Sequence, residues 1–410
     1  MSWFATLLQY ASLARPPGFS REKHDLQPDG KSCALSRTNQ VPLMLIHLVC
    51  AARPNFMKVA PLYHALTREA WASLVLVHTG QHYDSNMSDA FFEDLGMPSP
   101  DIYLDVKSGS HAEQTGRVMM AYERVLEEQR PDLIVVVGDV NSTMAATIAA
   151  TKLGLTVAHL EAGLRSYDRS MPEEINRLVT DVLADMLWTP SRSASENLIR
   201  EGISQSKIHF VGNIMIDSLE MMRAKIESLE EFRLFGLQAR GYAIVTMHRP
   251  SNVDDPIVLR EICTVLVELA EKMPLVFPIH PRTRQKMEEY HLLPLLEGSK
   301  KVSMPEPLNY IRFMNLVFNC RFVITDSGGI QEETSYLGIP CLTLRKNTER
   351  PITVTHGTNQ LCELPQLKKK VDEILSEQGR RRSAIEFWDG RTAGRIVEIL
   401  RRNRMEMHSR

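Results

Sequence analysis

The sequence predicts an α/β protein with two Rossmann-like, doubly wound domains in tandem and a cleft between them. Three observations predict this fold class. Apolar strands alternate with amphipathic helices from Leu43 onward, the strands are nearly continuous apolar runs, and the whole alternation occurs twice. Such strands, separated by helices, are typical of a parallel sheet that is covered on both faces. At 410 residues the chain is also too long for one ordinary core.

The first Rossmann-like domain is expected within residues 41–220. Strands are predicted over 43–49, 73–80, 132–139 and 155–163, and helices over 55–69, 85–96, 111–130 and 143–154. Another helix is indicated by apolar residues at helical spacing, namely Ile175, Leu178, Val179, Val182, Leu183 and Met186. Such a stripe is typical of a helix that packs its apolar face against a core.

The second Rossmann-like domain is expected within residues 221–385, after a polar helical stretch over 220–236. Strands are predicted over 242–248, 274–280, 301–307, 321–326 and 339–345, and helices over 256–272, 282–291, 309–319 and 331–338. Residues 386–410 are assigned to a C-terminal helix that packs back toward the first domain. Residues 1–40 lack periodicity, a basic start and a transit-peptide composition, so a disordered or extraneous extension is expected there.

Composition and charge narrow the setting. Apolar content of 43% and charged content of 24% are typical of a globular protein, and a net charge of −2 gives no electrostatic reason to expect a nucleic-acid or acidic-membrane partner. No apolar run is long enough to cross a bilayer. The six cysteines are scattered without zinc-site spacing, and several lie in apolar runs. Buried, reduced thiols and a cytoplasmic location are therefore expected.

The second domain carries the clearest ligand motif, "TDSGGIQEE". A strand ends at Asp326, Ser327, Gly328 and Gly329 form a tight turn, and a helix begins. Glycines let backbone approach a ligand, and the free N–H groups of a helix start favour an anion. This pattern predicts a phosphate site, with Glu333 placed to accept hydrogen bonds from ribose hydroxyls. The alternative is an ordinary turn whose acids favour the helix dipole.

In the first domain, Arg53 and Lys58 flank the start of the first helix, where they could grip a diphosphate. Alternatively, Lys58 is a solvated helix residue. The junction has no GxGxxG pattern, so a dinucleotide fingerprint is missing and a dehydrogenase is not favoured.

Carboxylates end two neighbouring strands of the first domain. Asp139 follows "LIVVVG" and Glu161 follows "TVAHL", so both are expected to point into one crevice and to form an acid/base pair. Glu173 opens the next helix and could close over that crevice. Local rules favour a structural role for it, because Pro172 takes the first helical position and Glu173 and Arg177 have the spacing of an ion pair.

Histidines also end strands, namely His82, His248 and His280. His248, beside Arg249, is expected to face the cleft and to stabilise a leaving diphosphate. Each histidine could instead bond only to loop backbone.

Eight motifs occur together in order: "ARPNFMKVAPL", "HTGQHYD", "VVGDVNST", "HLEAGLRS", "MPEEINR", "MHRPSN", "TDSGGIQEE" and "NTERPITV". In order and spacing the chain resembles the non-hydrolysing UDP-N-acetylglucosamine 2-epimerases from about Leu43 to Arg401. The resemblance implies a GT-B fold, usually as a homodimer, and C2 epimerisation of UDP-N-acetylglucosamine to UDP-N-acetylmannosamine without metal or NAD.

The resemblance also implies residue roles. Catalytic roles fall on Asp139, Glu161, Glu173 and His248. UDP-sugar contacts fall on Arg53, Lys58, Arg165, Arg249, His280, Ser327, Gly328, Gly329 and Glu333. In bacterial members a second, regulatory substrate site matches Gln81 and His82, with His280. No metal ligands are implied.

The implied chemistry needs several groups at once. The C2 proton lies beside an amide nitrogen and becomes removable only as UDP leaves C1. The family is thought to eliminate UDP, to hold 2-acetamidoglucal and to add UDP back. Carboxylates near C2, a cationic clamp on the diphosphate and a closed cleft are required.

Some positions depart from the family pattern. Ala51 replaces a usual glycine, "RPNF" lacks an acid, Ile352 replaces an acid, and "GTNQLCELPQL" lacks a usual glycine. These departures indicate a subgroup in which the sugar and any regulation are less settled than the fold. Two other functions stay open: a GT-B glycosyltransferase with an acceptor groove, and a non-catalytic UDP-sugar sensor.

Overall fold

The computed structural model describes residues 43–51, 53–80, 94–107, 109–376 and 384–408. These residues form one compact unit. The expected extension over 1–40, the residues Gln81 and His82, and most of the helix expected over 85–96 lie outside the described residues.

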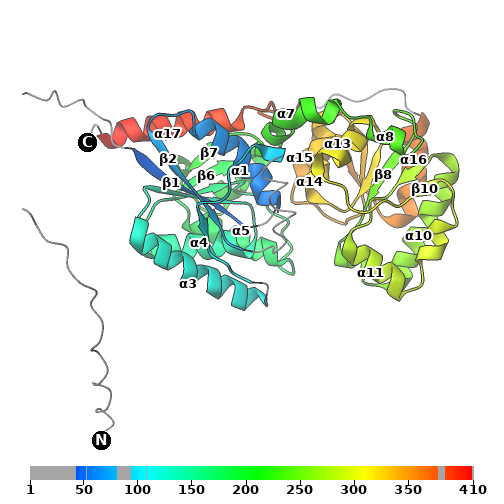
Figure 1. The fold of residues 1–410 in the computed structure, drawn as a ribbon, viewed down its shortest axis with the longest axis horizontal. Coiled ribbons are helices and arrows are strands. Elements are labelled where there is room, and N and C mark those ends of the chain that lie inside the picture. The colour runs from blue at the N-terminus through cyan, green and yellow to red at the C-terminus, as the bar shows by residue number, and fades with distance from the viewer. Residues whose placement is uncertain (1–42, 52, 81–93, 108, 377–383, 409–410) are drawn as a thin grey trace, which may run out of the picture. The chain divides into compact units, whose positions relative to one another are not determined.

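The predicted fold class is confirmed, because the described residues form two parallel sheets flanked by helices (Figure 1). The first sheet has seven strands in the order β3-β2-β1-β4-β5-β6-β7. Their bounds are β1 Met44–Cys50, β2 Ala72–His78, β3 Ile102–Tyr103, β4 Leu133–Val137, β5 Val157–Leu160, β6 Met186–Thr189 and β7 Ile208–Phe210. The order reverses between β1 and β4, and ligands bind at such a switch point in open α/β sheets.

Helices cover both faces of this sheet. They are α1 Arg53–Leu66, α3 His111–Gln129, α4 Asn141–Lys152, α5 Pro172–Leu183, α6 Arg192–Arg200, α7 Ile214–Glu227 and α17 Thr392–His408, with a short turn η1 Gln205–Lys207. On β4, Val135 packs into the core shared with α1, α7 and α17, whereas Ile134 and Val136 pack with α3 and α4. Alternation along a strand that is buried throughout explains the continuous apolar run.

The second sheet has six strands in the order β10-β9-β8-β11-β12-β13, and the switch point lies between β8 and β11. The strands are β8 Ala243–Thr246, β9 Leu275–Val276, β10 Val302–Ser303, β11 Val323–Thr325, β12 Cys341–Thr343 and β13 Asn359–Leu361. The helices are α8 Glu231–Leu234, α9 Pro250–Val253, α10 Pro256–Lys272, α11 Pro281–Glu289, α12 Leu293–Glu297, α13 Tyr310–Asn319, α14 Gly328–Leu337, α15 Pro351–Thr355, η2 Leu364–Gln366 and α16 Leu367–Ser376.

Helix α7 differs from the polar separator that the sequence predicts. Eight of its residues are buried, among them Leu219 and Met222. It packs on α1 and α17, and also on α13 and α14 of the second sheet's layer. The sequence predicts that residues 214–219 end the first domain and that a separate polar helix follows. The apolar segments "IMI" and "MM" are therefore assigned to different elements, and the buried face of one helix is not recognised.

Helix α5 contradicts the expected apolar stripe. It ends at Leu183, and Met186 opens strand β6 instead. Ile175 and Val182 are 41% and 61% exposed. The buried residues are polar, namely Glu174, Asn176, Arg177, Thr180 and Asp181. The helix therefore docks on the strand ends through charged groups and hydrogen bonds, and periodicity of apolar residues does not detect such a face.

Five cysteines fall within the described residues, and each is buried with a free thiol, as expected. No described helix has the length and apolar character that a membrane span requires.

Candidate active site

Glu161 lies directly after β5, at the carboxyl edge of the first sheet. Its backbone has a left-handed φ of 75°, uncommon for a residue with a side chain, and its N–H donates to the carbonyl of Trp188 at 3.1 Å. The side chain is only 8% exposed. One carboxylate oxygen pairs with Lys58 of α1, and the other accepts from Arg350 Nη2 at 2.9 Å. Glu161 is thus held between a cation that follows β1 and a cation of the second sheet's layer.

Gly138 makes room for this arrangement. It precedes Asp139 in the turn after β4 and has a φ of 69°. A Cβ placed there would lie 3.2 Å from Lys58 Nζ and 3.3 Å from Asn55 Nδ2. The glycine is therefore required both by the left-handed turn and by the close approach of the lysine.

The ion pairs set the charge of Glu161. Burial alone would raise the pKa of its carboxyl, but Lys58 and Arg350 outweigh burial and hold the pKa below its ordinary value. Glu161 is therefore a stable carboxylate at neutral pH while both cations remain in place.

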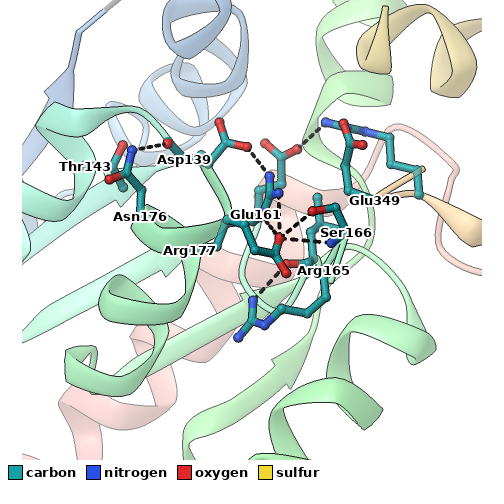
Figure 2. Close-up of polar contacts among 12 residues, drawn as sticks. Asp139, Thr143, Glu161, Arg165, Ser166, Asn176, Arg177 and Glu349 are labelled. Carbon is teal, nitrogen blue, oxygen red and sulfur yellow. Dashed lines mark hydrogen bonds and ion pairs between the residues drawn. The ribbon is translucent and has the colours of Figure 1, made fainter. Parts of the chain in front are cut away.

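Asp139 faces the same strand edge, and α5 holds it from the side (Figure 2). Arg177 Nη1 donates to Asp139 Oδ2 at 2.5 Å, and Asn176 Nδ2 donates to the Asp139 carbonyl at 2.8 Å. The Asp139 side chain remains 32% exposed. The structure therefore places Asp139 in one fixed orientation with its carboxylate still accessible.

The expected Glu173–Arg177 pair is wrong. Arg177 pairs with Glu174 at 2.7 Å and with Asp139. Glu174 also accepts from the backbone N–H groups of Ser166 and Tyr167, both at 2.9 Å, so it secures the loop before α5. Glu173 is left exposed at the first turn of α5. Without the pair that local rules assigned to it, Glu173 is free for another role.

A cavity of about 860 Å³ adjoins Glu173. Residues of both sheets' layers line it, among them Glu173, Arg249, Asn252, Arg345 and Leu364. A cavity of this size accommodates a small ligand or cofactor. Asp139 and Glu161 do not line the cavity. Of the three acids to which the resemblance gives catalytic roles, only Glu173 lines it.

Asp326 organises the switch point of the second sheet. It is fully buried after β11 and accepts the backbone N–H groups of His248 and Arg249 at 3.0 and 2.9 Å. His248 Nδ1 lies 3.0 Å from its other oxygen. Burial raises the pKa of Asp326, but His248 and the N–H donors outweigh burial and hold it below the ordinary value. His248 is therefore oriented by a carboxylate and is still 39% exposed.

β11 ends at Thr325 and α14 begins at Gly328, so the strand, turn and helix start from which an anion site is predicted are present. Ser327 is the N-cap residue, and its side chain makes no capping hydrogen bond. A Cβ on Gly328 would lie 2.6 Å from Arg350 Nη1 and 2.8 Å from Glu349 Oε1, whereas a Cβ on Gly329 would meet nothing within 4 Å. Arg350 therefore lies against the helix start and reaches Glu161 at the same time.

Two buried carboxyls follow on α14. Glu332 lies 3.0 Å from Arg350 Nε, and Glu333 accepts the Tyr310 hydroxyl at 2.7 Å. Burial raises the pKa of both to about 7, against the opposing effects of Arg350 on Glu332 and of Tyr310 on Glu333. Both groups therefore titrate near neutrality.

Some predicted site residues lie elsewhere or cannot be placed. Arg165 is 2% exposed and pairs with Glu201 and Asp181 below the strand edge, so the structure does not bring it to the cavity. His280 caps α11 by accepting Arg282 N–H, and its ring lies 5.4 Å from that of His248. Nothing is described of the Arg53 side chain, and Gln81 and His82 lie outside the described residues. Among described residues, no cluster of three or more His, Cys, Asp or Glu side chains is arranged to hold a metal.

Sequence reasoning missed Arg350, Asn176 and the central role of Arg177. Arg350 belongs to the "NTERPITV" motif, so a signal existed, but its partner Glu161 lies 189 positions away. Asn176 and Arg177 were assigned to the helix alone, because only the fold shows that α5 turns this face toward β4.

Two parallel sheets flanked by helices, with residues of both layers lining one cavity, have the architecture of a two-domain α/β enzyme. Residues 64–401 match the family model described as UDP-N-acetylglucosamine 2-epimerase, and the chain belongs to this family.

Relatives of known name match most of this chain in sequence. A UDP-N-acetylglucosamine 2-epimerase of Methanocaldococcus jannaschii is 40% identical over 366 residues, which cover 87% of this chain and 99% of that protein. Its crystal structure with UDP-GlcNAc and UDP superposes with a TM-score of 0.80 at 40% identity over 87% and 99% of the two chains. A UDP-2,3-diacetamido-2,3-dideoxy-D-glucuronate 2-epimerase of Pseudomonas aeruginosa is 41% identical over 78% of this chain and 88% of its own.

Proposed function

We propose that the protein reversibly epimerises UDP-N-acetylglucosamine at C2 to UDP-N-acetylmannosamine, by elimination and re-addition of UDP. Family membership and the relatives' activities support the reaction. In the forward step a carboxylate takes the C2 proton, the C–H electron pair forms the C1–C2 double bond, and the C1–O bond breaks to release UDP. In the return step a proton reaches C2 on the other face, and a UDP oxygen attacks C1.

One observation carries this proposal. Arg350 lies against the α14 start and also donates to Glu161 at 2.9 Å. The first contact belongs to the expected diphosphate site, and the second belongs to the expected acid/base group. The two halves of an elimination, a departing diphosphate and a proton acceptor, therefore share one guanidinium.

This sharing has a consequence for the base. A carboxylate paired with two cations is a weak base, because its pKa is held low. A diphosphate at the α14 start would compete for Arg350 and so relieve Glu161 of one cation. The pKa of Glu161 would then rise toward its useful range as substrate binds. We propose Glu161, Asp139 and Glu173 as the acid/base group and His248 as the group that assists the leaving diphosphate.

The remaining binding roles follow the same arrangement. We propose that Ser327, Gly328 and Gly329 hold the diphosphate, that Glu333 holds the ribose, and that Lys58, Arg53 and Arg249 complete the cationic clamp. No metal or nucleotide cofactor is part of this proposal. A cytoplasmic homodimer, with residues 41–220 and 221–385 as its two domains in each subunit, is proposed on the same family grounds.

The experiment is incubation of the purified protein with UDP-N-acetylglucosamine in D2O, followed by NMR of the sugar. Deuterium at C2 together with the mannosamine isomer is expected. No deuterium and no isomer would contradict the proposal. Transfer of the sugar to an added acceptor would indicate a glycosyltransferase, and tight binding without turnover would indicate a sensor.

A second substrate is supported by the Pseudomonas aeruginosa relative, which is 41% identical over 322 residues. Its substrate differs in carrying a second acetamido group and a carboxylate on the sugar. The same D2O experiment with UDP-2,3-diacetamido-2,3-dideoxy-D-glucuronate distinguishes the two. A kcat/KM for this sugar well above that for UDP-N-acetylglucosamine would change the substrate but not the C2 chemistry.

A further inference from the structure

We propose that His159 is a positioning residue for the reaction, which joins the three elements that carry Asp139, Glu161 and Glu173. The inference rests on the proposed C2 chemistry. His159 lies on β5, two residues before Glu161, and is fully buried. It contacts no substrate, so any effect on the reaction must pass through the groups that it holds.

The two ring nitrogens of His159 bind two different elements. Nε2 lies 2.8 Å from the carbonyl oxygen of Gly138, in the turn that presents Asp139. Nδ1 lies 2.6 Å from Oδ1 of Asp181, on α5. With Glu161 on the end of its own strand, His159 connects β4, β5 and α5.

These contacts determine where the ring protons are. A carbonyl oxygen only accepts, so Nε2 must carry a proton. Burial raises the pKa of Asp181, but His159 and Arg165 outweigh burial and hold it below its ordinary value, so Asp181 is an ionised acceptor. Both ring nitrogens therefore lie against acceptors on two different elements, which hold the ring from two sides.

Asp181 extends the connection to the backbone after Glu161. Its Oδ2 accepts the Gly163 N–H at 3.1 Å and Arg165 Nη1 at 2.7 Å. Arg165 in turn holds Glu201, at the end of α6, at 2.6 Å. The left-handed Glu161 is thus followed by two residues, Gly163 and Arg165, that the same carboxylate ties to α5.

His159 and Asp181 together fix the position of α5 against the first sheet. Helix α5 holds Asp139 through Asn176 and Arg177, and it presents Glu173 from its first turn. The position of α5 against the sheet is fixed in turn by Asp181 on His159. Loss of the contact between His159 and Asp181 would move Asp139, Glu161 and Glu173 relative to one another. Misplacement of a catalytic group by about 1 Å can reduce a rate about 100-fold.

His47 is a matched control. It lies on β1, is also fully buried, and also has both ring nitrogens in hydrogen bonds, with Tyr122 and Gln129 at 3.1 Å. Those partners lie on α3, and none of them holds a proposed site residue. If substitution of either histidine lowers thermal stability, the loss is due to removal of a buried polar group. If only substitution of His159 lowers kcat, the loss is due to its positioning role.

The experiment compares His159→Leu, His159→Gln and His47→Leu in the full chain. Each is measured for kcat and KM of C2 epimerisation, for UDP affinity, for thermal stability, and for amide hydrogen exchange at Gly163. We expect His159→Leu to lower kcat about 100-fold with KM within about threefold, and His47→Leu to leave kcat within about twofold. His159→Gln keeps a donor for the Gly138 carbonyl and should recover part of kcat.

Two results would overturn the proposal. One is a similar fall in stability for both leucine variants, with equal kcat per folded molecule. The other is unchanged exchange at Gly163 in His159→Leu, a readout that does not depend on activity. If the wild-type protein lacked C2 exchange altogether, the proposed function would fail, and the exchange at Gly163 would still decide whether His159 fixes the loop after Glu161.

Discussion

Acids at the switch point of the first sheet and the two glutamates of α14 have pKa values shifted in opposite directions. At the first sheet, Glu161, Glu174 and Asp181 are paired with lysine, arginine or histidine, which hold their pKa values low. At the second sheet, Glu332 and Glu333 have pKa values raised to about 7 by burial. Glu161, which is proposed for the chemistry, is therefore held as a carboxylate, whereas the two glutamates beside the proposed nucleotide site titrate near neutrality.

The difference shows what each region is built to do. Paired charges hold side chains in fixed places, as an acid/base group requires, but they weaken each carboxylate as a base. Arg350 is the one described residue that pairs with acids of both regions, namely Glu161 and Glu332. A diphosphate that bound Arg350 would remove one cation from Glu161, and Glu161 would then become a stronger base.

The largest expected effect is that of Glu161→Gln. Removal of one acid/base carboxylate should lower C2 deuterium exchange by about 10³-fold, within the range of general acid–base catalysis. UDP affinity should not fall, because Ser327, Gly328 and Gly329 are unchanged and Arg350 loses a competing acid. Exchange measured by NMR and UDP binding measured by calorimetry check this. Equal losses in both would mean that Glu161 serves binding instead.

Arg350→Met tests the link between the two regions. It leaves Glu161, Glu349 and Glu332 short of a cation in a buried place, and breaking such a pair costs about 3–5 kcal/mol in the free energy of unfolding. The matched control is Arg192→Met, because Arg192 pairs with Glu386 at the surface, where both side chains are exposed. That change should leave the free energy of unfolding close to the wild-type value, because water screens an exposed pair. Urea denaturation of the two variants gives the comparison, and similar losses would contradict the link.

The sequence predicted the second region better than the first. Ser327, Gly328, Gly329 and Glu333 lie within one short segment, so the strand end, turn and helix start can be recognised locally. Asp139 and Glu161 were also predictable, since carboxyl ends of neighbouring parallel strands meet at one edge. Arg177, Asp181 and Arg350 were not, because their partners are distant in sequence and the buried face of α5 is polar. Arg165 was assigned to the substrate by the resemblance, yet its guanidinium holds Glu201 and Asp181.

Two neighbouring glycines test the geometry of the α14 start. In Gly328→Ala the new methyl group would overlap Arg350 and Glu349, so the variant should lose about 1–3 kcal/mol of stability. Gly329→Ala has open space and a helical position, so it should gain up to about 1 kcal/mol. Thermal unfolding of the ligand-free variants measures both. Equal shifts in the same direction would show that Arg350 does not lie against Gly328.

The last effect concerns the pH dependence that Glu333 gives to the free energy of unfolding. Its folded pKa of about 7 is above the unfolded value, so between about pH 4.5 and 7 the folded state binds more protons and stability falls as pH rises. The paired acids of the first region have the opposite sign, because their lowered pKa values give stability that is lost only on strong acidification. Glu333→Gln should therefore raise the free energy of unfolding at pH 8 relative to pH 5 by about 2 kcal/mol. Denaturation at the two pH values measures this, with Glu363→Gln, at an exposed carboxylate, as the control. A pH dependence identical to that of the wild-type protein would mean that Glu333 is already ionised at pH 5, and the contrast with the acids of the first sheet would then rest on Glu332 alone.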